Sequence, residues 1–397
     1  MDPDYKYPPD NHPKTKIVCT LGPSTDTEEI LLELVQSGMT VARLNMSHGD
    51  LETHKDTVRK VRKVSEDSGL PIGLMVDIPG TKYRTGPLDP GAVTLQEGSL
   101  IVLTSNDVVG NQHRVSVAPV GLHRDAEPQG TILVDDGNIE LVVTDVSEND
   151  VLCKVVRGGR LTQGRGVVTP GRSPSQEFPD AKAISCLEFA ASADADFVAL
   201  STVTTGEDIK RAREILKKNG MKSPFLISKV ERAEAIENID EIVEESDALM
   251  VARGDMGVEV PLKRVPVIQK DLIKRSNSAG KPVITATQML ESMINSSSPT
   301  RAEVTDVANA VYDGSDAIML SGETSIGEYP VEAVKVMAET AMEAEAALPY
   351  ARMMEERFSQ LEAVTDDAIS FAACQTLNAL ASDLIVAITE SCNSAAS

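Results

Sequence analysis

The sequence predicts an α/β protein built on a (β/α)8 TIM barrel, because strand-like and helix-like segments alternate along most of the chain. Short runs rich in Val, Ile and Leu are separated by longer stretches of helical period. The runs are apolar throughout, which is typical of parallel strands covered on one face by helices. Eight such units predict a closed barrel. The expected strands are KIVCT (16–20), TVARLN (40–45), IGLMVD (72–77), DFVALS (196–201), FLISK (225–229), ALMVA (248–252), PVITA (282–286) and AIMLS (317–321).

Helices are expected between most of these strands, where apolar residues recur at helical spacing. They cover residues 26–37, 51–68, 206–218, 233–245, 262–279, 300–312 and 330–346.

Residues 78 to about 178 break the alternation. Helical period is scarce there, and strand-like runs such as LIVLT (100–104) occur beside turn signals such as DDG (135–137). A β domain inserted through a βα loop explains this composition, and it would lie on the barrel face where active sites are found. A lid is the role expected of such a domain. The barrel domain then comprises residues 1–79 and 179–347, and the lid residues 80–178.

The charge balance limits the classes of partner. Acidic residues outnumber Lys plus Arg by 61 to 38, which argues against a non-specific binder of nucleic acid or anionic membranes. Anionic substrates stay compatible, because a few convergent cations and a metal ion can invert the field inside a site.

The cysteine spacing and the N-terminal segment indicate the cellular compartment of the protein. The five cysteines are far apart and form no C-x-x-C pair, so neither disulfides nor a structural zinc site is expected. The N-terminus has no basic start followed by an apolar run, as a signal peptide would. No apolar stretch approaches the roughly 18 residues of a membrane span. We therefore expect a cytoplasmic protein.

Polar side chains recur at the carboxyl ends of the expected strands, the edge at which a barrel carries its active site. A single residue of this kind is explained as well by a helix cap, a turn or a solvated charge. Seven strand ends in register weaken that explanation. The residues are Arg43 and Asn45, Asp77, Ser201, Lys229 and Glu231, Arg253 and Asp255, Thr287, and Ser321 and Glu323.

Two neighbouring strand ends carry the residues expected to bind a metal. In ISKVE (227–231), Lys229 and Glu231 are two residues apart, so in extended backbone they project to the same side. Asp255 follows the next strand. Two carboxylates suit Mg²⁺ or Mn²⁺, and the adjacent ammonium can neutralise a phosphoryl group. A surface salt bridge between Lys229 and Glu231 is the plainer alternative.

Longer blocks of the chain resemble the pyruvate kinase family. They keep their order and spacing over the whole barrel, and several exceed ten residues, so the match is far more specific than a lone glycine motif. The blocks are TKIVCTLGPS (15–24), ARLNMSHG (42–49), VDDG (134–137), ISKVE (227–231), MVARGDMGVEVP (250–261), AGKPVITATQMLESMI (279–294), PTRAEVTDVANAVYDGSDAIMLSGET (299–324) and YPVEAV (329–334).

The resemblance implies a fold and a reaction. The fold is a TIM barrel with an inserted β-barrel lid domain and a truncated C-terminal α/β domain in residues 348–397. The reaction is the glycolytic transfer of a phosphoryl group from phosphoenolpyruvate to ADP, which gives pyruvate and ATP. A divalent cation, Mg²⁺ or Mn²⁺, is the implied cofactor.

Site roles follow from the same resemblance. Arg43 and Arg84 contact phosphate groups, Glu231 and Asp255 hold the divalent metal, and Lys229 stabilises the phosphoryl group in transit as a fixed cation. The implied catalytic residues are Lys229, Thr287 and Arg43.

The implied ligand contacts extend around this centre. Backbone N–H groups of the turn from Arg253 to Asp255 meet the carboxylate of phosphoenolpyruvate, and Gly254 allows the close approach. The Thr287 hydroxyl lies near the enolate, and Ser321 and Glu323 extend the polar network. Nucleotide contacts are implied for Arg84, Arg165, Asn45 and His48.

At three positions this chain has a different residue from the family pattern, and each difference affects the role expected at that position. Where many members have DTKGPEIRTG, this chain has DIPGTKYRTG (77–86), with Lys82 in place of the glutamate. Arg165 replaces a lysine, and Thr202 replaces a phenylalanine after Ser201.

Lys82 affects the expected requirement for a monovalent cation. In the family, the glutamate accompanies a potassium requirement, and a lysine ammonium can take the electrostatic place of the ion. We therefore expect activity without potassium, with Lys82 as the substitute. The implied potassium positions are Asn45, Ser47, Asp77 and Ile78.

The carboxyl terminus predicts a helix at 367–381 and a strand, DLIVAITES, at 383–391. They match the start of the family's third domain, so we expect no effector site there. A native short form, a shortened chain and a partner that completes the domain are all compatible with the sequence. A homo-oligomer is expected, with a dimer favoured over the family's tetramer.

Two other functions stay open at this point. A barrel lyase or aldolase could use the same metal-bound enolate, although the lid and the paired arginines argue against it. A non-catalytic ligand sensor is the other, and the intact residues Lys229, Glu231, Asp255 and Thr287 argue against that.

Overall fold

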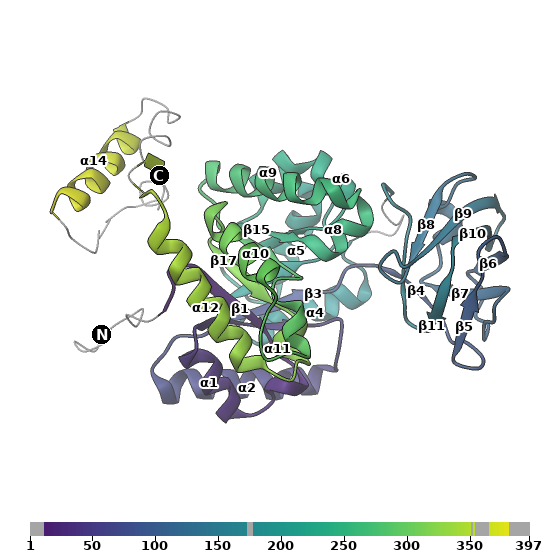
Figure 1. Ribbon diagram of the computed structural model, residues 1–397, viewed down its shortest axis with the longest axis horizontal. Helices are drawn as coiled ribbons and strands as arrows, with labels where there is room; N and C mark the ends of the chain where they lie inside the picture. Colours follow the sequence, from purple (N-terminus) through teal and green to yellow (C-terminus); the bar gives the residue numbers. More distant parts are fainter. Residues whose placement is uncertain (1–11, 173–177, 351, 354–364, 381–397) are drawn as a thin grey trace.

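The largest unit of the protein is a closed barrel of eight parallel strands, seen in a computed structural model that describes residues 12–172, 178–350, 352–353 and 365–380 (Figure 1). The strand order around the barrel is β1-β17-β16-β15-β14-β13-β3-β2. This confirms the predicted fold class, and each predicted strand is found to within about one residue at either end. The strands are β1 (Lys16–Thr20), β2 (Met39–Asn45), β3 (Gly73–Ile78), β13 (Phe197–Leu200), β14 (Leu226–Val230), β15 (Ala248–Ala252), β16 (Val283–Ala286) and β17 (Ala317–Leu320).

Helices cover the outside of this barrel. The longer ones are α1 (Glu28–Gln36), α2 (Leu51–Ser68), α4 (Ala181–Ser192), α5 (Gly206–Lys218), α9 (Val265–Ser278), α10 (Arg301–Tyr312) and α12 (Pro330–Ala347). Several of them start at side-chain caps: Asp50 accepts from the Thr53 N–H at the start of α2, and Thr300 pairs with Glu303 at the start of α10.

The single helix predicted for residues 233–245 is wrong. Two short helices, α6 (Ala233–Glu237) and α7 (Ile239–Glu245), meet at Asn238. The Asn238 side chain donates a hydrogen bond to the Thr204 carbonyl oxygen at 2.9 Å, and this tertiary contact accompanies the break.

The barrel has two apolar cores. Its lumen is filled by side chains such as Val18, Met75, Ile227, Met250 and Met319. The other core lies between the strands and the helices outside them. Filling the lumen makes the barrel a solid scaffold, so ligands can reach only its ends.

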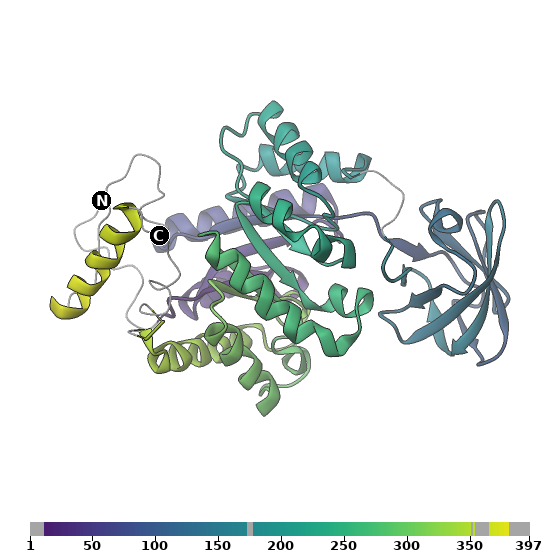
Figure 2. The same ribbon diagram turned by 90° about the horizontal axis from the view of Figure 1, so that it is seen from above.

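A second, smaller barrel follows β3 in the chain, and Figures 1 and 2 show it standing beside the first. Its strand order is β10-β6-β7-β4-β12-β8-β9, and it has its own apolar core. The strands are β4 (Tyr83–Thr85), β6 (Leu100–Thr104), β7 (Arg114–Ala118), β8 (Thr131–Val134), β9 (Ile139–Val146), β10 (Asp150–Arg157) and β12 (Gly166–Val168). The predicted inserted β structure is thus present, with a further two-stranded sheet of β5 (Ala92–Leu95) and β11 (Gly159–Thr162).

Near the carboxyl terminus, α14 (Thr365–Leu380) covers most of the helix expected at 367–381. The strand expected at 383–391 lies outside the described residues. Within the part of the chain that the structure describes, no helix is both long enough and apolar enough to cross a membrane.

Truncating a side chain in the lumen should destabilise the barrel. Met250 is fully buried there, so Met250→Ala should lower the free energy of unfolding by about 2–5 kcal/mol, the range for a cavity left by a large side chain. Thermal or denaturant unfolding measures this loss. Leu262→Ala is the control, because Leu262 is 74% exposed, and its loss should be near zero. Equal effects of the two substitutions would contradict a packed lumen.

Candidate active site

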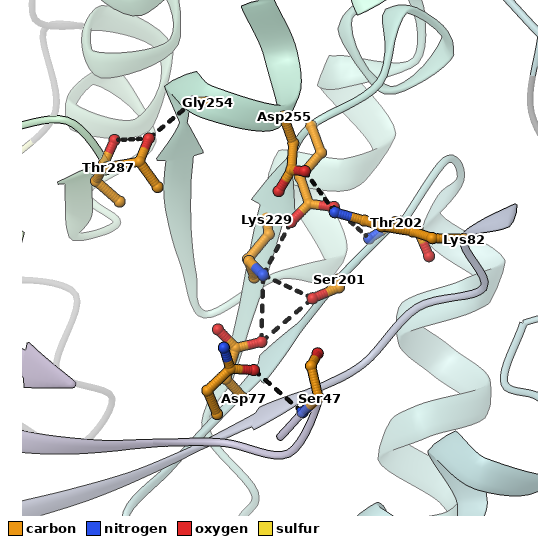
Figure 3. A network of polar contacts seen from close by, with 12 residues as sticks. Ser47, Asp77, Lys82, Ser201, Thr202, Lys229, Gly254, Asp255 and Thr287 are labelled. Atoms are coloured by element: carbon orange, nitrogen blue, oxygen red, sulfur yellow. Dashed lines mark hydrogen bonds and ion pairs between the residues drawn. The ribbon is translucent and has the colours of Figure 1, made fainter. Parts of the chain in front are cut away.

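The Lys229 ammonium is the centre of a buried polar cluster at the carboxyl end of the barrel (Figure 3). Lys229 lies on β14 and donates to Ser201 Oγ at 2.6 Å and to Asp77 Oδ1 at 3.2 Å. Its Nζ also lies 2.8 Å from Glu231 Oε1. The three strands β3, β13 and β14 are neighbours in the barrel, which is why their ends bring these groups together.

Arg43 is the second buried cation of this cluster. Its Nε donates to Asp77 Oδ2 at 2.8 Å and its Nη1 to Thr20 Oγ1 at 2.7 Å. Asp77 therefore lies between Arg43 on β2 and Lys229 on β14. The structure brings together the sequence-predicted residues Arg43, Asp77, Ser201, Lys229 and Glu231.

Burial and pairing together set the charge states in this cluster. Burial opposes ionisation of Asp77, but the nearby Lys229 and Arg43 outweigh it and hold the pKa of Asp77 below its usual value. Burial likewise opposes the charge on Lys229, whereas Asp77 and Glu231 raise the pKa of Lys229 above its usual value. The pKa of Glu231 is lowered, because Lys229 and Lys82 outweigh its desolvation. Lys229 therefore remains a cation and is unsuited to act as a base.

Glu231 and Asp255 form the pair of carboxylates expected to hold a metal. The Glu231 side chain is 1% exposed and its Oε2 accepts from the Thr202 N–H at 3.2 Å, while the Asp255 side chain is 43% exposed. Among the described residues, no group of three or more His, Cys, Asp or Glu side chains is arranged to hold a metal. Two oxygen donors next to an open chamber fit a cation such as Mg²⁺, which keeps waters and takes other oxygens from its substrate.

Lys82 joins these two carboxylates. Its Nζ lies 2.5 Å from Asp255 Oδ1 and 3.7 Å from Glu231 Oε2. Figure 3 shows the Lys82 ammonium directed at Asp255, whereas Ser47 and Asp77 lie on the other side of Lys229. In this structure the ammonium therefore contacts the predicted divalent-metal ligands and not the predicted potassium positions.

Thr287 directly follows β16, and its hydroxyl forms hydrogen bonds with neighbouring backbone groups. Oγ1 accepts from the Gly254 N–H at 2.8 Å and donates to the Ala286 carbonyl oxygen at 2.6 Å. Thr287 has a φ of 67°, a strained value for a β-branched residue. Arg253 holds this backbone, because its Nη2 donates to the Thr287 carbonyl oxygen at 2.7 Å. A ligand carboxylate at the Gly254 N–H would have to replace the Thr287 hydroxyl.

The hydrogen bonds of Glu323 are to backbone groups and not to the side chains of the Lys229 cluster. Its carboxylate accepts from the backbone N–H groups of Ser321 at 2.7 Å and Leu290 at 3.1 Å. Burial raises the pKa of Glu323. These contacts join the loops that follow β16 and β17, so Glu323 organises backbone near the site.

Two chambers meet at Lys82 and Asp255. The first lies between the two barrels and is lined by Arg84, Arg165, Arg172, Glu231 and Glu259 as well. The second, of about 540 Å³, is also lined by Arg43, Asn45, Ser47, His48 and Lys229, and its size is typical of a small-molecule site. Cations from both barrels therefore surround the carboxylate pair, which suits a ligand with several negative charges.

A third cavity adjoins the second chamber and shares Asn45 and His48 with it. Its other walls include Pro23, Thr53 and Ile326, and it is more apolar than the chambers. No role was predicted for these three residues from the sequence. The Gly-Pro turn directly after the first strand was the signal available, since loops at that end of a barrel line its site.

Glu259 is another residue near the site for which the sequence predicted no role. It lies on α8 (Arg253–Glu259), one helical turn after Asp255, and that spacing could have revealed it. Its Oε2 accepts from the Gly171 N–H at 3.4 Å, and its Oε1 lies 3.9 Å from Arg232 Nη1. Gly171 belongs to the segment that leads back from the second barrel, so Glu259 connects that segment to the first barrel. Burial raises the pKa of Glu259 to about 7.

Comparison with known proteins gives consistent matches. Residues 12–334 match the family model described as pyruvate kinase, barrel domain. The chain is 43% identical over 380 residues to a pyruvate kinase of Bacillus licheniformis, covering 95% of this chain and 65% of that relative's length. It is 41% identical over 378 residues to a pyruvate kinase of Clostridium acetobutylicum, covering 95% of this chain and 80% of that protein.

A solved structure also matches. The crystal structure of a pyruvate kinase from Cryptosporidium parvum superposes with a TM-score of 0.91 at 38% sequence identity, covering 97% of this chain and 80% of that one. The likeness therefore extends over nearly the whole chain.

The raised pKa of Glu259 predicts a pH-dependent stability. Between pH 4.5 and about 7 the unfolded chain releases a proton that the folded protein keeps, so stability should fall as pH rises through this window. Glu259→Gln should remove that loss, which is at most about 3 kcal/mol. Thermal melts at pH 5 and pH 8, in chelator, compare the two proteins. The exposed Glu237→Gln is the control and should melt with the pH dependence of the original protein. A Glu259→Gln variant with unchanged pH dependence would contradict the assignment.

Proposed function

The chain belongs to the pyruvate kinase family, and from that premise we propose that it transfers the phosphoryl group of phosphoenolpyruvate to ADP, giving pyruvate and ATP. The observation that carries the proposal is the buried Lys229 ammonium, held by Asp77, Ser201 and Glu231 beside a second carboxylate at the mouth of the barrel. A fixed cation at that point can stabilise charge on a phosphoryl group in transit.

Glu231 and Asp255 are the proposed ligands of Mg²⁺ or Mn²⁺. A divalent cation there neutralises charge on the phosphoryl oxygens of the substrate. Glu231 is held in place by Lys229 and by the Thr202 N–H, so it is the fixed ligand of the pair. Asp255 is more exposed and lies in the first turn of α8, so it is the ligand whose side chain can adjust.

Lys229 and Arg43 are proposed to stabilise the phosphoryl group from two sides. Both line the second chamber, and both are anchored through Asp77. Because Lys229 keeps its proton, it acts by its charge and position. Its pre-set geometry means that little reorganisation is needed when charge builds up in the transition state.

The proton that converts the enolate into pyruvate has to reach its methylene carbon, and we assign its delivery to the region of Thr287. The Thr287 hydroxyl already holds the Gly254 N–H, the group proposed to meet the substrate carboxylate. Binding of that carboxylate would free the hydroxyl for the enolate. Binding of the substrate carboxylate would thereby free the Thr287 hydroxyl from its hydrogen bond with the Gly254 N–H.

The nucleotide is proposed to bind between the two barrels and along the adjacent third cavity. Arg84 and Arg165 line the first chamber and would contact phosphates, while Asn45 and His48 line both the second chamber and the third cavity. The apolar walls of that cavity suit a nucleobase. The second barrel, assigned to residues 80–178, would then act as a lid that excludes water during transfer.

Potassium is proposed to be dispensable. Lys82 lines the second chamber together with Asn45 and Ser47, two of the positions expected to bind a monovalent ion, so a rotation of its side chain away from Asp255 would bring the ammonium toward them. We propose that the reaction takes place in the cytoplasm. Assembly as a homo-oligomer, a dimer more than a tetramer, stays a prediction.

One coupled assay tests the reaction and its ion dependence. The purified full chain should form pyruvate from phosphoenolpyruvate, ADP and Mg²⁺, and replacing sodium with potassium should change the rate by less than about twofold, because Lys82 already supplies a cation. Binding of phosphoenolpyruvate without pyruvate formation would indicate a ligand sensor instead. Aldol cleavage without ATP formation would indicate a lyase. A many-fold rise with potassium would refute only the ion assignment.

Replacing Lys229 should separate binding from turnover. Lys229→Met should lower kcat by about 10³-fold or more, since a preorganised charge is lost from the transition state, while phosphoenolpyruvate affinity should change much less. Equilibrium binding and single-turnover kinetics measure the two effects.

The same substitution leaves Asp77 and Glu231 without their buried ammonium, so its melting temperature should also fall. Lys229→Arg keeps the charge and provides a comparison with less loss of stability. Lys210→Met removes an exposed ion pair with Glu245 and should leave kcat unchanged. Near-normal turnover of a folded Lys229→Met protein would disprove the role.

A further inference from the structure

The Lys82 ammonium lies where a divalent cation would contact the two proposed metal ligands. Its Nζ is 2.5 Å from Asp255 Oδ1 and 3.7 Å from Glu231 Oε2. Within the described part of the chain, the ion pairs of Asp255 involve Lys82 alone. Lys82 comes from the segment between β3 and β4 that joins the barrels, and Figure 3 shows its side chain directed at Asp255.

An ammonium at this place competes with a divalent cation bound by both carboxylates. A Mg²⁺ ion shared by the two carboxylates would bind an oxygen of each at about 2.0–2.1 Å. The Lys82 nitrogen, 2.5 Å from Asp255 Oδ1 and 3.7 Å from Glu231 Oε2, approaches the same two carboxylates and competes with such an ion for them. The two positive charges would also repel each other strongly at that separation. Lys82 must therefore move before Asp255 and Glu231 can bind a metal together.

We propose that Lys82 is an internal competitor for the divalent-metal site, occupying it in the metal-free protein and leaving when the metal binds. Relative to a chain without this ammonium, the competition weakens the affinity for the metal. It also balances the charge of Asp255 when no metal is bound, while Glu231 is already paired with Lys229. The inference rests on the proposed function only through the assignment of Glu231 and Asp255 as metal ligands.

The second chamber has room for the Lys82 side chain once it leaves Asp255. Its side chain is 31% exposed and lines both chambers, so a rotation away from Asp255 directs the ammonium into the second chamber. That chamber already contains the cationic side chains of Arg43 and Lys229. Arrival of a third cation would make it more attractive to an anion, so metal binding and anion binding should strengthen each other through Lys82.

Manganese binding to the full chain without substrate tests the competition. Lys82→Gln should bind Mn²⁺ at least about tenfold more tightly than the original protein, measured by electron paramagnetic resonance of free Mn²⁺. Lys182→Gln is the matched control, because Lys182 lines the same second chamber and loses the same charge, yet no contact joins it to the two carboxylates. Its affinity should stay within about twofold. Lys82→Arg keeps a cation at position 82 and should bind Mn²⁺ no more tightly than the original protein.

The outcomes separate this inference from the proposed function. Equal or weaker Mn²⁺ binding by a folded Lys82→Gln protein would overturn the competition, as would equally tightened binding by Lys182→Gln. Failure of every protein to bind Mn²⁺ would overturn the metal assignment as well.

Melting temperatures give an independent readout that needs no activity. Added Mn²⁺ should raise the melting temperature of Lys82→Gln more than that of the original protein, since stabilisation follows the ratio of metal concentration to Kd. Inorganic phosphate should tighten Mn²⁺ binding to the original protein, and it should do so less in Lys82→Gln. An equal effect of phosphate on both proteins would overturn the link between the metal and the second chamber.

Discussion

The neutral group of charges around Asp77 is the interaction on which the rest of the site depends. Arg43 and Lys229 are cations and Asp77 and Glu231 are anions, and all four are buried at the mouth of the barrel. None could be buried alone, because an unpaired charge in a dry interior costs several kcal/mol. Held as a set by three barrel strands, they form a rigid array that keeps each charge fixed. Such rigidity is what electrostatic preorganisation requires.

Most of the barrel could be predicted from sequence because its strands are apolar on both faces, and that composition is set by local burial. The break at Asn238 could not, since it accompanies a hydrogen bond to Thr204, which lies 34 residues earlier. The cluster of Arg43, Asp77, Lys229 and Glu231 could be predicted because each residue sits at a strand end, where the fold determines its position.

Residues on loops and helices were harder to assign. Lys82 was expected to act at the monovalent-ion positions, but the path of its loop directs the ammonium to Asp255. Glu259 owes its raised pKa to burial against a returning segment that sequence spacing does not reveal. Thr287 was identified, yet its contact with Gly254 depends on a φ of 67° that no residue pattern in the chain indicates.

The closure of the barrel has a consequence for synthesis of the chain. Strand β1 pairs with β2 on one edge, but its other partner is β17, and Thr20 Oγ1 donates to the Leu320 carbonyl oxygen across 300 residues. The second barrel, by contrast, is complete within residues 83–168. During synthesis on a ribosome the smaller barrel can therefore fold first, whereas one edge of β1 stays unpaired until β17 has been synthesised. During that interval an unpaired strand edge is exposed, which makes the growing chain a natural client for chaperones.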